Sequence, residues 1–205
     1  MKSSYQTISI EASIKYVEKK SVFLAHSFLV TSETQAQQLI SDAKKKHRDA
    51  THNVYAYYIS GEESQVSLKF SDDGEPSGTA GLPVLDSIRK ANLENTLIIV
   101  TRYFGGIQLG APGLVRAYGK AASLCLDESA VVTKLICTSI KLNFEYSLLE
   151  KIQKFLSSKS IETSSVVYKD VVEMDVLVPV DITEIFASEI FDLTQGVEVI
   201  TKSIL

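Results

Sequence analysis

The sequence is poor in features that define several large protein classes. It holds two cysteines, Cys125 and Cys137, which fit neither a CxxC motif nor a metal-ligand spacing. Both lie in apolar segments, which favours small core residues. No apolar run approaches the ~20 residues that cross a bilayer, so we expect no membrane partner. The N-terminus MKSSYQTISIEAS lacks the apolar block of a signal peptide, and a cytoplasmic location is therefore the default expectation.

Motifs of nucleotide chemistry are also missing. Gly105 and Gly110 have the spacing of a Walker A loop, but Ala111-Pro112 replaces the lysine and hydroxyl that this chemistry needs. There is no GxGxxG run, and no GxSxG elbow that would present a nucleophilic serine. We therefore expect no cofactor and assign no catalytic residue.

Charge is unevenly distributed along the chain. The formal net charge is −4, and residues 1–133 contribute 14 Lys/Arg and 14 Asp/Glu, a net of zero. Residues 134–205 carry 7 Lys/Arg and 11 Asp/Glu, which accounts for the whole excess. Because neutralised phosphates drive nucleic-acid affinity, the C-terminal part is poorly suited to that role. Nucleic-acid binding by the N-terminal part stays possible, provided that its positive and negative charges are segregated on the surface.

The first part of the chain alternates between strand and helix patterns. VFLAHSFLV predicts a mostly buried strand. Ser32 with Gln35 forms a capping box ahead of apolar residues at helical spacing. This helix ends in residues 44–48 (KKKHR), which are either the cations that a helix C-terminus favours or a phosphate-contacting patch.

The middle of the chain continues the alternation. HNVYAYYIS and SQVSLKF, joined by residues 61–63, predict a hairpin. A helix is expected over roughly Thr79–Lys90, with regular bonding beginning close to Pro83. TLIIVT (96–101) is the best candidate for a parallel or central strand, and 113–127 predicts a further helix, with Pro112 in its first turn.

A second pattern begins near Lys134 and has the order βαββαβ, which predicts a ferredoxin-like domain. Its expected elements are a strand over 136–146, a helix capped by Ser147 with Glu150, a hairpin of 161–168 and 171–178, a helix opened by Asp181 with Glu184 and ended by Gly196, and a last strand over 197–204. The sequence thus predicts an α+β protein of two domains, 1–133 and 134–205.

Residues 71–119 concentrate backbone freedom and ionisable groups, as binding surfaces usually do. The run 105–113 enters a helix, so its N–H groups and the helix dipole are placed to receive an anion, with Arg102 and Arg116 on either side. The alternative is that its glycines only permit tight packing of strand on helix. The predicted binding surface consists of His52, Asp72, Asp73, Glu75, Arg102, Tyr103, Phe104, Gly105, Gly106, Gly110 and Arg116.

Several of these residues have more than one interpretation. The acidic loop 72–75 is a magnesium or calcium site, a solvated turn, or an ion-pair partner of Arg102, and we assign no metal to it. His52 is a structural residue or half of a Ser–His pair, although no orienting acid is evident near it. Tyr103 and Phe104 stack on bases, grip a protein, or pack into the core.

The longest motifs carry a family resemblance. DDGEPSGTAGLP (72–83) and VTRYFGGIQLGAPGLVRAYG (100–119) resemble the signature of the Impact/YigZ family, and KSVFLAHS and HNVYAY resemble its two earlier blocks. The resemblance implies an N-terminal domain like the second domain of ribosomal protein S5. It also implies a C-terminal domain like the ferredoxin-like final domain of elongation factor G, and a link to translational control known for the eukaryotic relatives.

The chain departs from the family pattern at two places. Ala111-Pro112 removes a hydroxyl and one backbone donor from the loop, which weakens an anion cradle there. Val54 stands where the family often has cysteine, which argues against a catalytic cysteine in that block.

The leading expectation is a non-catalytic protein linked to translation that contacts RNA, the ribosome or a protein partner through residues 71–119; no DNA partner is expected. One alternative is an enzyme acting on a phosphorylated or peptide-like small molecule between the two glycine-rich loops. Another is a purely protein-binding regulator, which the neutral-to-acidic charge slightly favours over direct RNA binding.

Overall fold

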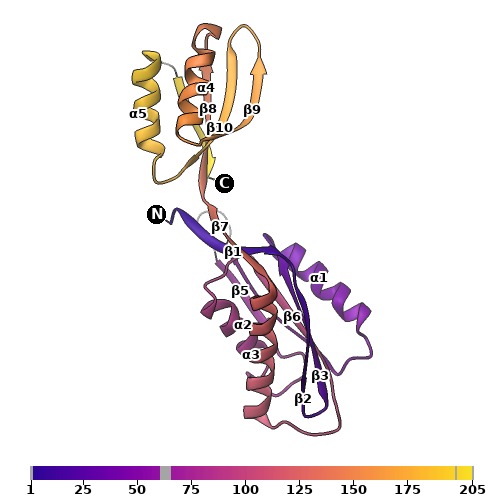
Figure 1. Cartoon of the computed structure of the whole chain (residues 1–205). Helices are drawn as coiled ribbons and strands as arrows, with labels where there is room; N and C mark the ends of the chain where they lie inside the picture. The colour runs from indigo at the N-terminus through magenta and orange to yellow at the C-terminus, as the bar shows by residue number, and fades with distance from the viewer. Residues whose placement is uncertain (1, 61–65, 197, 205) are drawn as a thin grey trace. The chain divides into compact units, whose positions relative to one another are not determined.

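The computed structural model describes residues 2–60, 66–196 and 198–204. The chain forms two compact units, one of Gln6–Lys134 and one of the residues from Leu135 onward together with those up to Tyr5 (Figure 1). Each unit has its own apolar core. No helix among the described residues is both long and apolar enough to cross a membrane.

The N-terminal unit is built on a five-stranded antiparallel sheet of order β2-β3-β6-β4-β5. Its strands are β2 (Ser13–Glu18), β3 (Ser21–Leu29), β4 (His52–Ser60), β5 (Val66–Ser71) and β6 (Thr96–Tyr103). The β4–β5 hairpin was predicted, and its connecting residues 61–63 lie outside the described part of the chain. Two further strands, β1 (Ser4–Ile10) and β7 (Ala130–Leu135), pair as a separate sheet.

Helices cover both faces of the five-stranded sheet. On one face lie α2 (Gly81–Lys90) and α3 (Ala111–Glu128), and on the other lies α1 (Glu33–Lys46). Strand β6 is buried on both sides, with Ile98 and Val100 in the core under α2 and α3, and Leu97 and Ile99 in the core under α1. The predicted central strand is therefore confirmed, and both of its neighbours are antiparallel to it.

The helix termini show which local signals were decisive. The Ser32 hydroxyl accepts the Gln35 amide at 3.2 Å, as the capping box predicts, and Gln35 returns its side chain to the Thr31 amide at 3.0 Å. α2 begins at Gly81, two residues later than expected. α3 begins at Ala111, two residues earlier than expected, with Pro112 in its first turn.

The C-terminal unit has the predicted ferredoxin-like fold. Its elements are β8 (Cys137–Phe144), α4 (Leu149–Ser158), β9 (Glu162–Tyr168), β10 (Val172–Pro179), α5 (Thr183–Thr194) and β11 (Glu198–Ile204). The sheet order is β11-β8-β10-β9, and all its pairings are antiparallel. Both helices pack on one face through a core that includes Ile140, Ile152 and Phe186.

Two predicted helix caps in this unit are wrong. Ser147 lies inside a short 3₁₀ helix, η2 (Tyr146–Leu148), so it lacks the extended backbone that a cap needs, and Leu148 precedes α4 instead. Ile182, not Asp181, precedes α5, and it makes no side-chain cap bond.

The two cysteines differ in burial. Cys125 is buried in the N-terminal core, where burial raises the pKa of its thiol to about 11, and Cys137 is half-buried.

Candidate functional site

Strand alternation divides the predicted surface between the two faces of the sheet. Side chains on a strand point alternately to opposite faces. Arg102 shares the face of Ile98 and Val100, which is covered by α2 and α3. Tyr103 therefore faces the α1 side, where its hydroxyl lies 2.9 Å from His47 Nδ1. Arg102 and Tyr103, which are adjacent in the motif, therefore lie on opposite faces of the sheet.

A buried polar cluster occupies the end of β6 under α3. Arg102 Nη1 donates to Glu75 Oε1 at 2.6 Å, and these residues are only 5% and 8% exposed. The Tyr118 hydroxyl donates to the same Glu75 oxygen at 2.8 Å. Burial and the Glu75 charge raise the pKa of Tyr118, so this phenol remains a neutral donor.

Two aromatic rings lie close to the Arg102 guanidinium. Its carbon lies 5.6 Å from the ring centres of both Phe23 and Phe104. Its second terminal nitrogen donates to the Ser21 hydroxyl at 3.3 Å, while Nε has no hydrogen-bond partner among the described residues. Arg102 is thus an internal residue that fastens the acidic loop to the sheet.

Asp72 is committed to the start of α2. One carboxylate oxygen accepts the amides of Ala80 and Gly81 at 2.9 and 2.8 Å, and the other accepts the Gly78 amide at 2.8 Å. The first helical amides have no partner within the helix, so an upstream carboxylate supplies one. These hydrogen bonds hold the acidic loop against the N-terminus of α2.

Asp73 links the acidic loop to α1 and β4. Its carboxylate accepts Lys44 Nζ and the Asn53 amide, both at 2.6 Å. Partial burial by itself raises the pKa of Asp73, but these two bonds outweigh it and lower that pKa below its ordinary value. His52 Nδ1 donates to the Asp73 carbonyl at 2.8 Å, and its Nε2 lies 3.7 Å from Glu75.

The glycine-rich loop after β6 packs closely against the turn between β2 and β3. A Cβ on Gly105 would lie 2.0 Å from the Lys20 carbonyl carbon, so only glycine fits there. Gly106 follows in the same loop, and Gly110 has φ +70° at the N-cap of α3. Phe104 and Ile107 project from this loop and are exposed. The first glycine thus serves the close packing of two loops.

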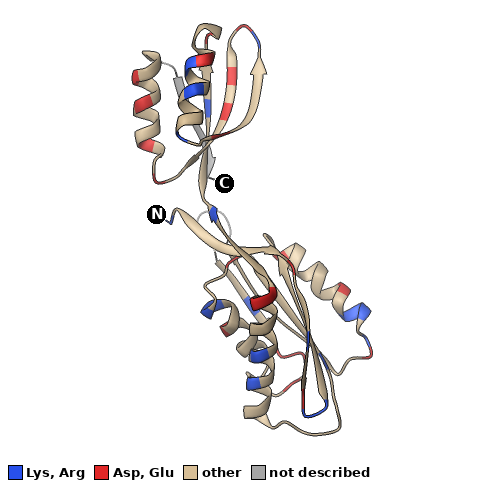
Figure 2. Cartoon of the chain, viewed as in Figure 1, with Lys and Arg blue, Asp and Glu red and all other residues tan. Residues whose placement is uncertain are grey.

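A cation-lined hollow lies between that turn and α3; we call it the cationic groove. Its volume is about 530 Å³, and its lining residues are Tyr16, Glu18, Lys19, Leu109, Gly113, Arg116, Ala117 and Lys120. Arg116 and Lys120 are exposed and one helical turn apart on α3, and Lys19 is exposed at the end of β2. In Figure 2, the blue of Lys and Arg marks both α3 and the turn between β2 and β3.

The cations of the cationic groove are not ion-paired within the described part of the chain. Lys19, Arg116 and Lys120 make no ion pair with any residue that the structure describes. The one acidic lining residue, Glu18, accepts the Tyr16 hydroxyl at 2.8 Å, which raises the pKa of Tyr16. This groove is therefore positively charged and open to an external anion.

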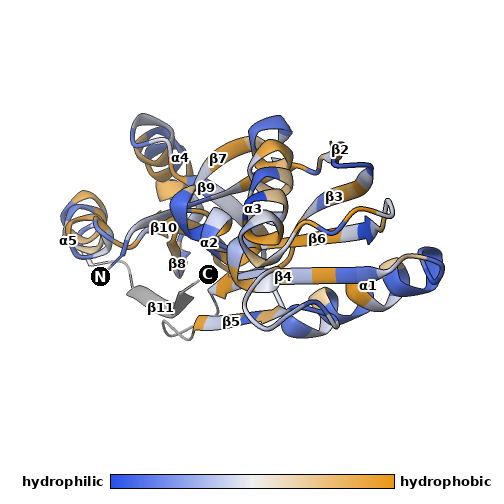
Figure 3. Cartoon of the chain, turned by 90° about the horizontal axis from the view of Figure 1, so that it is seen from below, coloured by the Kyte–Doolittle hydropathy of each residue, from blue (hydrophilic) through white to orange (hydrophobic). Residues whose placement is uncertain are grey.

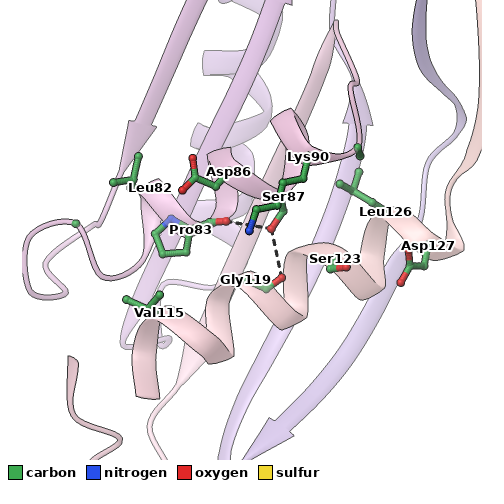
Figure 4. Close-up of a pocket in the computed structure, with 12 residues that line it drawn as sticks. Leu82, Pro83, Asp86, Ser87, Lys90, Val115, Gly119, Ser123, Leu126 and Asp127 are labelled. Carbon is green, nitrogen blue, oxygen red and sulfur yellow. Dashed lines mark hydrogen bonds between the residues drawn. The ribbon is translucent and has the colours of Figure 1, made fainter. Parts of the chain in front are cut away.

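A second hollow of about 520 Å³ lies between α2 and α3 (Figure 4). At its centre the Ser87 hydroxyl contacts the carbonyl oxygens of Pro83 and Gly119 at 3.0 and 3.3 Å. Asp86, Lys90 and Asp127 also line it, so it carries mixed charge. Within the described part of the chain, no group of three or more His, Cys, Asp and Glu side chains is arranged to hold a metal ion.

Comparison with known proteins places these features in a family. Residues 19–126 match the Impact N-terminal domain, and residues 142–197 match a domain of unknown function, DUF1949. The chain belongs to the IMPACT family. The first match spans the acidic loop, the glycine-rich loop and the whole cationic groove except Tyr16 and Glu18.

Family members of similar length share both units. The IMPACT family member YvyE of Bacillus subtilis is 40% identical over 96% of this chain and 89% of its own. The family member YigZ of Escherichia coli is 30% identical over 87% of each chain. A crystal structure described as that of an hypothetical protein aligns over 99% of both chains with a TM-score of 0.70 and 27% identity.

The family motif and the accessible surface coincide only in part. Phe104, Gly106, Gly110 and Arg116 lie on or beside exposed loops, whereas Glu75 and Arg102 are internal. Sequence reasoning missed Lys19 and Lys120. The spacing of Lys120, four residues after Arg116, was the available signal, because such residues share one face of a helix. Nothing in the sequence places Lys19 beside them.

Proposed function

We propose that this protein is a non-catalytic binding protein of translation that contacts RNA, with backbone phosphates held at the cationic groove. The translational setting rests on IMPACT family membership together with the translational link of the family's eukaryotic members. The observation that carries the RNA contact is the convergence of Lys19, Arg116 and Lys120, none of them paired within the described chain. Unpaired cations around a hollow are suited to RNA phosphates, because each phosphate that such a cation neutralises releases counterions condensed on the RNA.

The neighbouring loop supplies the apolar part of the proposed surface. Phe104 and Ile107 are exposed on the same glycine-rich loop that contributes Leu109 to the cationic groove. Exposed aromatic rings next to cations are the usual means by which single-stranded RNA is held without sequence preference. The proposed footprint therefore runs from Phe104 through Leu109 to the exposed face of α3.

The buried cluster does not favour the enzyme alternative. The Glu75 carboxylate accepts hydrogen bonds from Arg102 and Tyr118. Glu75 and Arg102, the two members of the ion pair, are almost closed to solvent. A general acid or base must reach the substrate proton within hydrogen-bond distance. His52 is the more accessible neighbour, but its Nδ1 is bonded to the Asp73 carbonyl and its Nε2 faces the buried Glu75 carboxylate at 3.7 Å. We therefore assign these residues to the positioning of the loops.

The test is RNA affinity as a function of salt. A fluorescein-labelled single-stranded RNA of about 20 nucleotides binds the wild-type protein, and its affinity falls with rising salt. In Arg116→Ala/Lys120→Ala, affinity at low salt drops and the slope of log K against log salt becomes shallower by roughly 1.4, since each single-strand phosphate contact contributes about 0.7. Fluorescence anisotropy measures both quantities.

The matched control is Arg89→Ala/Lys90→Ala, which removes the same charge from the end of α2. It leaves affinity and slope close to those of the wild type. An equal loss in both double variants contradicts a specific groove, and an unchanged Arg116→Ala/Lys120→Ala variant places any RNA contact elsewhere. A wild-type protein that binds no RNA at low salt overturns the RNA proposal in favour of a protein partner.

A further inference from the structure

Strand β5 ends the five-stranded sheet and exposes apolar side chains. It pairs with β4 on one side, and no described strand pairs with its other side. Val66, Leu68 and Phe70 are 50%, 40% and 42% exposed. Figure 3 shows β5 at the margin of the sheet, with hydrophobic colour along it. Native edge strands are usually protected by charge, proline or a bulge, and here Lys69 is the single charge among Val66–Ser71.

The apolar side chains of β5 share one face. In register with β4, Phe70 lies opposite Ala56 and Leu68 opposite Tyr58, and Ala56 belongs to the core under α2 and α3. Val66, Leu68 and Phe70 therefore extend the α2–α3 face of the sheet beyond its last core residue. Ser67 and Lys69 point to the α1 face, where the Ser67 hydroxyl donates to Glu33 Oε1 at 2.6 Å.

We propose that β5 is a self-association surface, on which β5 of a second copy pairs antiparallel about a two-fold axis through Leu68. Residues directly opposite in an antiparallel pair point to the same face. This register places Leu68 opposite the partner's Leu68 and Val66 opposite the partner's Phe70, so every apolar residue meets an apolar one. The interface is isologous, which suits a closed dimer and continues the sheet across the two copies.

Charge on the α1 face selects this register. Ser67 lies opposite the partner's Lys69, so a second cation joins this copy's own Lys69 near Glu33, the acceptor of the Ser67 hydroxyl. The two-fold axis repeats this attraction on the other side. Hydrogen bonds from Ser67 and Tyr57 lower the pKa of Glu33, so the carboxylate is charged at neutral pH.

The neighbouring registers are less favourable. A shift by one residue per copy in one direction sets Lys69 against the partner's Lys69, and like charges directly opposite destabilise a sheet. The opposite shift pairs only Val66, Ser67 and Leu68 within the described strand. The register centred on Leu68 pairs the five residues Val66–Phe70 and sets no charge against its like.

The first experiment measures mass against concentration for the full chain by sedimentation velocity. The wild type shifts from monomer to dimer as concentration rises. Leu68→Lys weakens the dimer by roughly tenfold or more, because it sets two charges together on the axis. Val167→Lys, the matched change on the exposed edge strand β9, keeps the wild-type behaviour. Circular dichroism checks that both variants are folded.

Charge exchange and cross-linking test the register itself. Lys69→Glu weakens the dimer, and Glu33→Lys/Lys69→Glu restores it, which a purely apolar contact does not require. In a Cys137→Ser background, Leu68→Cys oxidises to a disulfide dimer because the two positions face each other on the axis, whereas Phe70→Cys does not.

A wild type that remains monomeric at every concentration overturns the proposal. The proposal is also overturned if Val167→Lys dissociates the dimer and Leu68→Lys does not. A disulfide that forms as fast in Phe70→Cys as in Leu68→Cys contradicts the register. Because none of these variants touches the cationic groove, the outcome is independent of RNA binding.

Discussion

At the residue scale, the charged members of the central motif are mainly structural. Arg102 and Glu75 form an ion pair that is closed to solvent, whereas Arg116, in the same motif, is exposed and unpaired among the described residues. Breaking a buried pair by removing one partner leaves an uncompensated charge, which costs far more than losing a surface charge. The two arginines therefore predict opposite phenotypes.

We expect Arg102→Ala to lower the free energy of unfolding by about 3–5 kcal/mol, because Glu75 would then be buried without its cation. Arg116→Ala changes that free energy by less than about 0.5 kcal/mol, as exposed substitutions usually do. Urea unfolding at neutral pH measures both values. A stability loss for Arg102→Ala no larger than that for Arg116→Ala contradicts the structural role of this pair.

Asp73 gives the protein a predicted acid sensitivity. Its folded-state pKa is depressed, so its ionic contribution is present above the unfolded pKa of about 3.9 and is lost as pH falls through the lower folded value. Asp73→Asn is therefore less stable than wild type at pH 7, and the gap in urea midpoint closes below about pH 3.9. Asp170→Asn, in the exposed β9–β10 connection, serves as the control and changes the urea midpoint little at pH 7, as exposed substitutions usually do.

At the scale of elements, the acidic loop acts as the N-terminal cap of α2. Asp72 accepts three amides at or just before the first turn, and Ala80, the residue at the N-cap, has no side chain able to do so. The sequence showed carboxylates ahead of a helix, but the separation of Asp72 from Gly81 exceeds that of any local capping motif. Only the folded loop shows which helix they serve.

Removing this cap has a predictable cost. We expect Asp72→Ala to destabilise the N-terminal unit by about 1–2 kcal/mol and to raise amide hydrogen exchange in the first turn of α2. Ser32→Ala, which removes the hydroxyl that accepts the Gln35 amide at the start of α1, costs about 1 kcal/mol and leaves α2 protection unchanged. Equal α2 protection in wild type and Asp72→Ala contradicts the capping role.

Periodicity identified the long elements and missed three of the short strands. α1, α3 and β6 have many apolar residues at regular spacing, and each was predicted to within a few residues. β1, β2 and β7 were not predicted. β2 exposes Val17 and half-buries Glu18, so its pattern lacks a clean apolar face, and its pairing with β3 determines it as a strand.

At the scale of the whole molecule, the described residues of the N-terminal unit form apolar cores that share no residue with the core of the C-terminal unit. Ile98 and Val100 lie in the N-terminal core and Ile140 and Phe186 in the C-terminal core. A domain with its own core can in principle unfold by itself. The two units are therefore expected to respond separately to core mutations.

Ile140→Ala tests this independence. It removes a fully buried side chain from β8 and is expected to cost the C-terminal unit about 2–5 kcal/mol. In hydrogen exchange followed by mass spectrometry, β8 and β10 lose protection while β6 keeps it. The reciprocal Ile98→Ala variant affects β6 and spares β10. Loss of protection in both units from either change indicates one cooperative unit.

The sequence by itself determined the α+β class, the ferredoxin-like order of the C-terminal elements and the family, because periodicity and long contiguous motifs are local properties. Tertiary structure decided how the central motif is used. Strand alternation sent Arg102 inward and Tyr103 to the opposite face, and the packing of the β2–β3 turn beside α3 brought Lys19 next to Arg116 and Lys120. Residues about a hundred positions apart become neighbours only through the sheet, so no local pattern could show which charges are paired and which face solvent.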